Sequence, residues 1–189
     1  MTSFALHLLR HGEPEGAGAL IGRTDGAPTI AGIAACVAQA RRLDVQVLVA
    51  SDLSRARLAG EAIGAATGMA LTIDPRWREL DFGAWDGMMP TDIDAAALSR
   101  FWDDPDRHAP PEGECWSALV RRVAAAIADL GPHPTLIVTH AGAMRAALAT
   151  LCGFDLHQVW ALDLPYGGLL SLRVWPEKKP VGQITGLRP

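Results

Sequence analysis

The sequence predicts an α/β fold with three layers, α/β/α, in which a mostly parallel sheet carries helices on both faces. Short apolar runs typical of strands alternate along the chain with segments of helical periodicity, and this order favours a parallel sheet between helices. In addition, three apolar runs end in polar or basic residues just before a loop or a helix. Ligands of α/β folds bind at such strand ends, so the same pattern indicates a binding site.

The first half of the chain supplies most of the alternation. Apolar, β-branched or leucine-rich runs predict strands, and Thr29 suits the N-cap of a helix. Between the first strand and that helix lies a glycine-rich loop, residues 12–28, whose length is typical of functional loops. The predicted strands are 4–9, 46–50 and, as an edge strand, 69–73; the predicted helices are 29–42 and 55–66.

The second half contains an irregular stretch and then resumes the alternation. Residues 76–89 are aromatic, acidic and without a clear period, and residues 103–113 hold three prolines, so we expect a lid-like insertion at about 76–113. No repeat or linker divides the chain, and we predict a single domain over 1–189. The remaining predicted elements are helices at 91–102, 116–130 and about 141–151, and strands at 136–138 and 169–175, the last with its direction left open.

Composition narrows the classes of function. With 189 residues, 49% hydrophobic and 20% charged, the chain has the profile of a globular protein. A net charge of −4 without a basic stripe argues against nucleic-acid binding, and no apolar run reaches 18 residues, so we expect no membrane contact. The three cysteines lack the spacing of a zinc site, and we expect neither a metal nor a cofactor. No signal peptide is recognisable, so we expect a cytoplasmic protein. We expect it to be a monomer or a homodimer.

Three strand ends carry the chemistry. The first delivers Arg10 and His11, the second is followed by Arg55 in the first turn of its helix, and the third delivers His140. If these strands are neighbours, two arginines and two histidines meet at one edge of the sheet. Arginines orient a dianion with bidentate geometry, a neutral imidazole is a nucleophile toward phosphorus, and a protonated one can bind equatorial oxygens. The pattern therefore predicts a small-molecule phosphomonoester as substrate.

A leaving alkoxide needs a proton donor, and the irregular stretch offers one. Glu79 is the candidate general acid, because a nearby phosphoryl dianion would favour its protonated form; Asp81 and Glu13 are alternatives. Arg23, in the glycine-rich loop, is a further cation that could contact the phosphate from the rim. Trp77, Trp85 and Trp102 could line a pocket for a flat group or could pack the insertion, and the sequence leaves both readings open. 

The candidate residues lie in five short blocks of the sequence. The blocks are Leu9-Arg10-His11-Gly12-Glu13, Gly22-Arg23-Thr24-Asp25, Ser51-Asp52-Leu53-Ser54-Arg55-Ala56, Glu79 with Phe82-Gly83-Ala84-Trp85-Asp86-Gly87, and Thr139-His140-Ala141-Gly142. They resemble the histidine phosphatase superfamily, whose members have phosphoglycerate mutase-like folds. The resemblance spans about residues 4–150, in the family's order, and implies that His11 becomes phosphorylated while Arg10, Arg55, Arg23, His140 and Ala141 surround the phosphate.

A finer resemblance is to the α-ribazole phosphatase branch of cobalamin biosynthesis. Residues 78–87 are similar to that branch, as are Trp102-Asp103-Asp104-Pro105 and residues 109–114. It implies a metal-independent phosphatase; the alternatives are a phosphoglycerate mutase-type phosphoryl transfer and a non-catalytic phospho-ligand binding protein. The chain differs from the residues usual in the family at four positions. Ala17 stands where the family often has an asparagine that serves as a phosphate ligand, and the other three positions are Pro14, Ala35 and Leu58.

Overall fold

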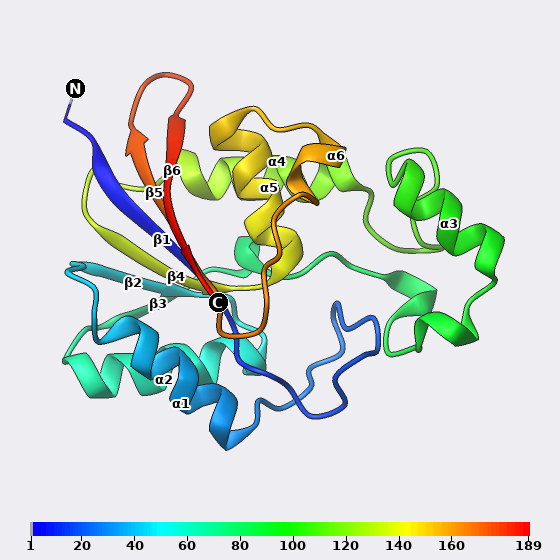
Figure 1. Ribbon diagram of the computed structural model, residues 1–189, viewed down its shortest axis with the longest axis horizontal. Helices are drawn as coiled ribbons and strands as arrows, with labels where there is room; N and C mark the ends of the chain where they lie inside the picture. The colour runs from blue at the N-terminus through cyan, green and yellow to red at the C-terminus, as the bar shows by residue number, and fades with distance from the viewer. Residues whose placement is uncertain (1) are drawn as a thin grey trace.

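The computed structural model of the protein describes residues 2–189 and contains one six-stranded sheet in the order β3-β2-β4-β1-β5-β6 (Figure 1). The strands β1 to β4 pair in parallel, whereas β5 and β6 join antiparallel beyond β1. The prediction of a mostly parallel α/β sheet is thereby confirmed. The strands are β1 (Phe4–Arg10), β2 (Val47–Ala50), β3 (Leu71–Ile73), β4 (Thr135–Thr139), β5 (Leu169–Trp175) and β6 (Val181–Arg188).

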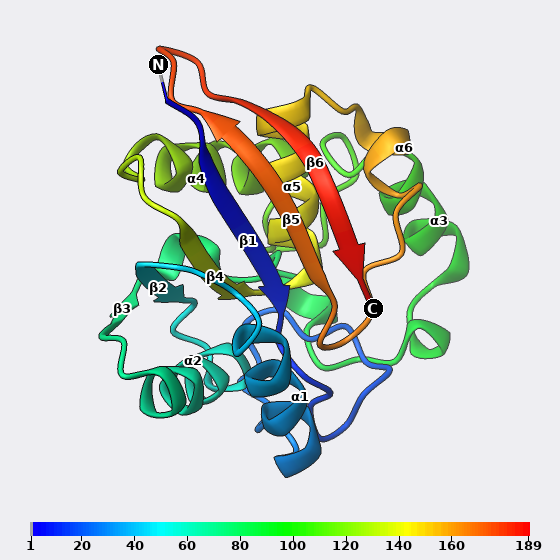
Figure 2. The ribbon, with the colours of Figure 1, turned by 60° about the vertical axis from the view of Figure 1, so that its left-hand side comes forward.

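Helices cover the sheet on two sides, as Figures 1 and 2 show. On one side lie α1 (Ile30–Ala40) and α2 (Ser54–Thr67), and on the other lie α4 (Trp116–Ala128) and α5 (Ala141–Cys152). Alternate residues along each strand point to opposite faces, so the sheet builds two cores. In β4, Ile137 packs with the α4 and α5 side and Leu136 with the α1 and α2 side.

Two further helices and three short turns lie beside the α4 and α5 layer. Helix α3 (Ala95–Asp103) belongs to the segment predicted as a lid-like insertion, and α6 (Leu156–Val159) precedes β5. Helix α3 begins four residues later than predicted, because Pro90 starts a separate turn and the Asp94 carboxylate caps the helix by accepting the Ala97 N–H at 2.8 Å. The 3-10 turns are Pro75–Trp77, Gly83–Trp85 and Pro90–Asp92.

The sequence indicated neither the four-residue helix α6 nor strand β6. The side chains of β6 are mostly exposed on the edge of the sheet, so its residues lack the apolar alternation that reveals a half-buried strand. Its pairing with β5 fixes it in place, which Figure 2 shows at the sheet edge. None of the helices within residues 2–189 is both long and apolar enough to cross a membrane.

The carboxyl ends of β1, β2 and β4 are held together by their own backbone. His11 N–H donates to the Thr139 carbonyl at 2.8 Å and Ser51 N–H donates to the Val138 carbonyl at 3.0 Å. Gly12 allows the start of α1 to pack closely on the end of β1, since a Cβ at this position would lie 2.2 Å from the Gly32 carbonyl oxygen. The three predicted strand ends are therefore neighbours at one edge.

Candidate active site

His11 and His140 lie side by side at this edge, with ring centroids 5.0 Å apart. The His11 ring is 4% exposed, and its Nδ1 lies 2.7 Å from the Gly12 carbonyl oxygen. A carbonyl only accepts, so Nδ1 carries the proton and Nε2 keeps its lone pair. Burial, with the charges of Arg55 and Arg10, lowers the pKa of His11 to about 3. The free protein thus presents a neutral imidazole, the form that can attack phosphorus.

His140 is fully buried beside it and is positioned by Ser51. Its Nε2 lies 2.9 Å from the Ser51 hydroxyl, and its buried Nδ1 has no hydrogen-bond partner among residues 2–189. Burial, then the neighbouring cations, place the pKa of His140 well below its usual value. The sequence pattern predicts a protonated ring, whereas the structure indicates a neutral His140 ring in the free protein. A bound dianion would help to protonate this ring.

Arg55 is 1% exposed, and its guanidinium binds the glycine-rich loop. It donates to the carbonyls of Thr24 at 2.8 Å, Gly22 at 2.8 Å and Ile21 at 2.9 Å. Burial lowers the pKa of Arg55, while the charge of Glu79 acts in the opposite direction. The side chain therefore shapes the loop and also brings a positive charge to the hollow that His11 lines.

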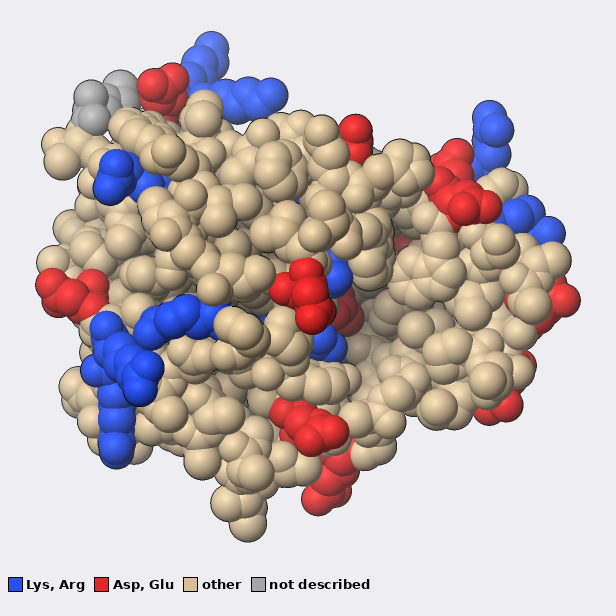
Figure 3. Space-filling view, in the orientation of Figure 1, with Lys and Arg blue, Asp and Glu red and all other residues tan. Residues whose placement is uncertain are grey.

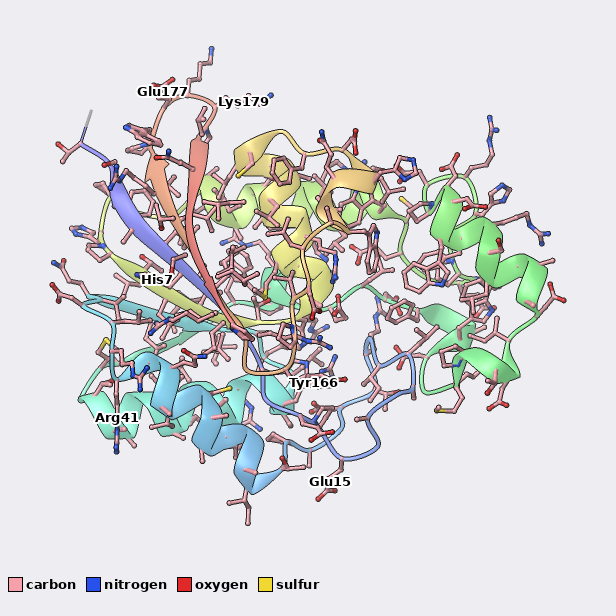
Figure 4. The ribbon with its side chains drawn as sticks, in the orientation of Figure 1. His7, Glu15, Arg41, Tyr166, Glu177 and Lys179 are labelled. Carbon is pink, nitrogen blue, oxygen red and sulfur yellow. The ribbon has the colours of Figure 1, made fainter. Side chains whose placement is uncertain are left out.

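Arg10 is fixed by a residue that the sequence reasoning missed. Its guanidinium lies 3.9 Å from the centre of the Tyr166 ring and donates to the Leu164 carbonyl at 2.7 Å, while its buried Nε has no partner among the described residues. Figure 4 shows Tyr166 on the loop before β5, beside the end of β1. Its ring is also 5.5 Å from that of His11. Tyr166 is the single tyrosine of the chain and precedes Gly167-Gly168, and this was the feature of the sequence that could have marked it as a candidate site residue.

Glu79 reaches the site from the segment between β3 and α3. Its carboxylate accepts the N–H of Leu80 at 2.8 Å and the N–H of Gly142, in the first turn of α5, at 3.1 Å. A Cβ on Gly142 would lie 2.0 Å from the Glu79 carboxylate, so this docking requires glycine. The alternatives are placed elsewhere: Asp81 pairs with Arg23 at 2.9 Å, and Glu13 is exposed. 

These groups surround one hollow of about 140 Å³ at the sheet edge. Its polar lining consists of Arg10, His11, Arg55, Glu79 and Tyr166, and the fully buried His140 lies beside His11. Figure 3 shows acidic and basic atoms gathered around a hollow on this face. The predicted convergence of two histidines, two arginines and the acid is thus present in the structure.

The remaining predicted contacts lie around this hollow rather than on it. Arg23 has a side chain 71% exposed and lines a neighbouring hollow with Glu79 and Asp81. Ala141 faces a third, apolar hollow. Ala17 is exposed on the glycine-rich loop. The residues that this loop contributes to the hollow beside His11, called the catalytic hollow below, are Pro14 and residues 19–21. Within residues 2–189 no group of three His, Cys, Asp or Glu side chains is arranged to hold a metal ion.

A neutral imidazole, arginines and a carboxyl group at the carboxyl edge of a parallel sheet define an α/β enzyme that acts on phosphoryl groups. The model of the histidine phosphatase superfamily (branch 1) matches residues 6–184, which is nearly the whole chain. The protein belongs to this superfamily, as the signature blocks indicate, and it has a phosphoglycerate mutase-like α/β fold. It is an enzyme of the phosphatase class in that family.

Three comparisons show the range of its relatives. The chain is 32% identical over 169 residues to a glucosyl-3-phosphoglycerate phosphatase of Mycolicibacterium vanbaalenii, covering 80% of this chain and 75% of that one. It is 31% identical over 166 residues to a Yersinia pestis protein named "Probable phosphoglycerate mutase GpmB", with 80% and 76% covered. The α-ribazole phosphatase of Shigella flexneri shares the fold, with a TM-score of 0.81, 23% identity and 96% and 95% covered.

The buried histidines predict a pH dependence of stability. Because their pKa values are lowered on folding, the unfolded chain takes up protons below pH 6.5 that the folded protein does not. The free energy of unfolding should therefore fall as the pH is lowered from 7 to 5, with a slope approaching about 1.4 kcal/mol per pH unit for each such group. Urea unfolding at pH 7, 6 and 5 measures this.

His11→Gln provides the comparison, since glutamine stays neutral throughout the range. The variant should lose the part of the slope that corresponds to about one proton. Asp52 and Asp74, whose pKa values are lowered by their arginine partners, contribute only nearer pH 4, so they do not obscure this window. An identical slope in the variant and the natural protein would contradict a buried, neutral His11.

Proposed function

We propose that the protein is a metal-independent phosphomonoester hydrolase that works through a phosphohistidine formed on His11. The observation that carries the proposal is the single available lone pair of this ring, with Nδ1–H bound to the Gly12 carbonyl and Nε2 free. Nε2 attacks phosphorus in line, the bond from phosphorus to the leaving oxygen breaks, and the phosphoryl group stays on the imidazole.

The phosphoryl oxygens are bound by groups that already carry or can acquire positive charge. Arg10 and Arg55 line the hollow, and both retain N–H groups beyond those bound to carbonyls. His140 and the start of α5 at Ala141 lie beneath, where the helix end adds a partial positive charge. Arg23 is a rim contact in this proposal, and its ion pair with Asp81 has to open for that role.

Glu79 completes the cycle as acid and then as base. In the first step its carboxylic acid gives a proton to the leaving oxygen, so that a neutral alcohol departs. In the second, its carboxylate takes a proton from water while the water oxygen attacks phosphorus and the bond to Nε2 breaks. Phosphate and the original neutral imidazole result. The binding of Glu79 to the N–H of Gly142 supports this, because it orients the carboxyl group at the helix that follows His140.

The domain arrangement remains part of the proposal. All six strands, from β1 near the start of the chain to β6 near its end, belong to one sheet with a core on each face. This supports a single domain over 1–189. The segment at about 76–113 supplies Glu79 and α3, and we propose that it acts as a lid-like insertion over the leaving group. A cytoplasmic location and a monomeric or homodimeric state stay predictions.

His11→Ala should abolish the hydrolysis of p-nitrophenyl phosphate, measured in EDTA to keep metal ions away. The natural protein should remain active in EDTA, because arginines supply the positive charge, and acid-labile labelled phosphohistidine should be trapped on it by rapid quenching. The expected loss in the variant is more than about 10³-fold, since the nucleophile itself is removed. Activity retained by the variant, or lost by the natural protein in EDTA, would contradict the mechanism.

Glu79→Gln examines the acid step. A general acid matters most when the leaving group is basic, so the variant should lose far more activity on alkyl phosphates than on p-nitrophenyl phosphate. We expect the alkyl substrates to lose about 10²–10⁴-fold, the usual contribution of general acid catalysis. Asp81→Asn is the matched control, since Asp81 pairs with Arg23 outside the catalytic hollow. Equal losses on both substrate types would argue that Glu79 has another role.

The physiological substrate that the finer resemblance suggests is α-ribazole 5′-phosphate. The names of the relatives differ, so we expect a substrate panel to decide between it, glucosyl-3-phosphoglycerate and 3-phosphoglycerate. Free phosphate as the product from each identifies a hydrolase. Isomerised phosphoglycerate would instead reveal the mutase-type reaction, and binding without turnover across the panel would indicate a phospho-ligand binding protein. The highest kcat/KM on α-ribazole 5′-phosphate would support the branch assignment, and a low one would exclude it.

A further inference from the structure

An apolar hollow of about 100 Å³ adjoins the catalytic one, and Glu79 and Phe82 line both. Its walls come from the insertion, α4, α5 and α6, and they include Trp102, Trp116 and Trp160. Trp102 and Trp160 contact each other edge to face in these walls, with ring centroids 5.1 Å apart. Since the proposed acid Glu79 borders this hollow, a leaving group protonated by Glu79 would be bound there.

One charged side chain in this apolar hollow has no partner. Arg145 of α5 is 9% exposed and lines the hollow, yet within residues 2–189 no hydrogen bond or ion pair joins its guanidinium to another residue. Its guanidinium lies 3.9 Å from the centre of the Trp160 ring, and the carboxylates of Glu79 and Asp163 act on its charge without forming an ion pair with it. Burial lowers the pKa of Arg145. A buried cation without an ion pair is expensive, and this favours a role in binding an anion.

A comparison within the chain shows how unusual this is. Arg122 on the neighbouring helix α4 is also largely buried, and it pairs with Glu114 at 2.8 Å and donates to three backbone carbonyls. Arg55 likewise donates to three carbonyls. Arg145 has the same kind of environment without such acceptors. Its terminal nitrogens also have no partner among the described residues, so this end of the guanidinium remains available to a ligand in the hollow.

The shape and chemistry of the hollow select the ligand group. One face of the guanidinium is covered by Trp160, which leaves its planar edge, and that edge matches the two oxygens of a carboxylate. The surrounding aromatic walls favour a flat or apolar body. The phosphoryl group already has its own cations, Arg10 and Arg55, in the catalytic hollow.

We propose that Arg145 binds a carboxylate on the leaving group, so that the preferred substrates are phosphomonoesters whose alcohol part is flat or apolar and carries a carboxylate. This inference rests on the proposed phosphatase mechanism, in which the leaving group lies on the Glu79 side. It also changes the expected substrate class, because α-ribazole 5′-phosphate has no carboxylate. Arg145 is a specificity residue in this scheme and takes no part in the bond-breaking step.

The test compares paired substrates that differ only in charge. These are 3- and 4-carboxyphenyl phosphate, each set against the matching carbamoylphenyl phosphate. For at least one isomer the natural protein should show a kcat/KM ratio of about tenfold or more in favour of the carboxylate, the scale of a charge-assisted hydrogen bond. Arg145→Met, which keeps an unbranched chain beside Trp160 without the charge, should bring this ratio to about one or below. Arg145→Lys should lie between.

Each ratio comes from one preparation, so a reduced folded fraction cancels. Arg121→Met, an exposed position on α4, is the matched arginine control and should keep the natural ratio. A ratio near one for both isomers in the natural protein, or an unchanged ratio in Arg145→Met, would overturn the proposal and mean that Arg145 only packs against Trp160.

A binding measurement separates this inference from the mechanism. Calorimetric titration of the same four compounds into His11→Ala, with and without Arg145→Met, needs no turnover. Tighter binding of a carboxyphenyl phosphate than of its carbamoyl partner, lost with Arg145→Met, supports the inference even if hydrolysis does not follow the phosphohistidine route. Equal binding of both partners would overturn it even in an active phosphatase.

Discussion

The buried guanidinium of Arg55 is the constraint on which the site depends. Burying a charge is costly unless hydrogen bonds replace its contacts with water, and for Arg55 three carbonyls of the glycine-rich loop provide the acceptors. The loop therefore has to fold back over the end of β2, where residues 19–21 become a wall of the catalytic hollow. The same positive charge acts on His11 and disfavours its protonation. The buried guanidinium of Arg55 thus shapes the hollow and adds to the burial that keeps the His11 ring neutral.

The electrostatics of the site suit a dianion. Arg10 and Arg55 bring positive charge beside two imidazoles that burial keeps neutral, and Glu79 accepts hydrogen bonds from two backbone N–H groups. In the proposed mechanism a phosphoryl dianion would reverse the local balance, so that His140 could take a proton that the arginines otherwise oppose. The two rings differ in their hydrogen bonds, since His11 binds the Gly12 carbonyl and His140 binds the Ser51 hydroxyl.

Sequence reasoning found the residues whose placement follows from parallel strands. Arg10, His11 and His140 directly end buried strands, and Arg55 begins the next helix, so alternation alone brings them to one edge. Tyr166 and Arg145 escaped this reasoning for tertiary reasons. Tyr166 reaches the site because β5 pairs antiparallel with β1, a direction that the sequence left open. Arg145 lies in an alanine-rich helix, and its lack of a partner emerges only when α6 places Trp160 over it.

The structure also separates the chemistry from the choice of substrate. His11 and the two arginines come from strand ends and the turns that follow them, which the parallel sheet positions with little freedom. The walls of the apolar hollow come from α4 and α5 and, beyond the sheet and these helices, from the segment at about 76–113 and α6. Glu79 and Phe82 line both hollows, and the Gly142 contact docks Glu79 on the helix that starts after His140. In the proposed mechanism, changes in these outer walls would alter which leaving group is bound without moving His11 or the two arginines, so one fold can serve different substrates.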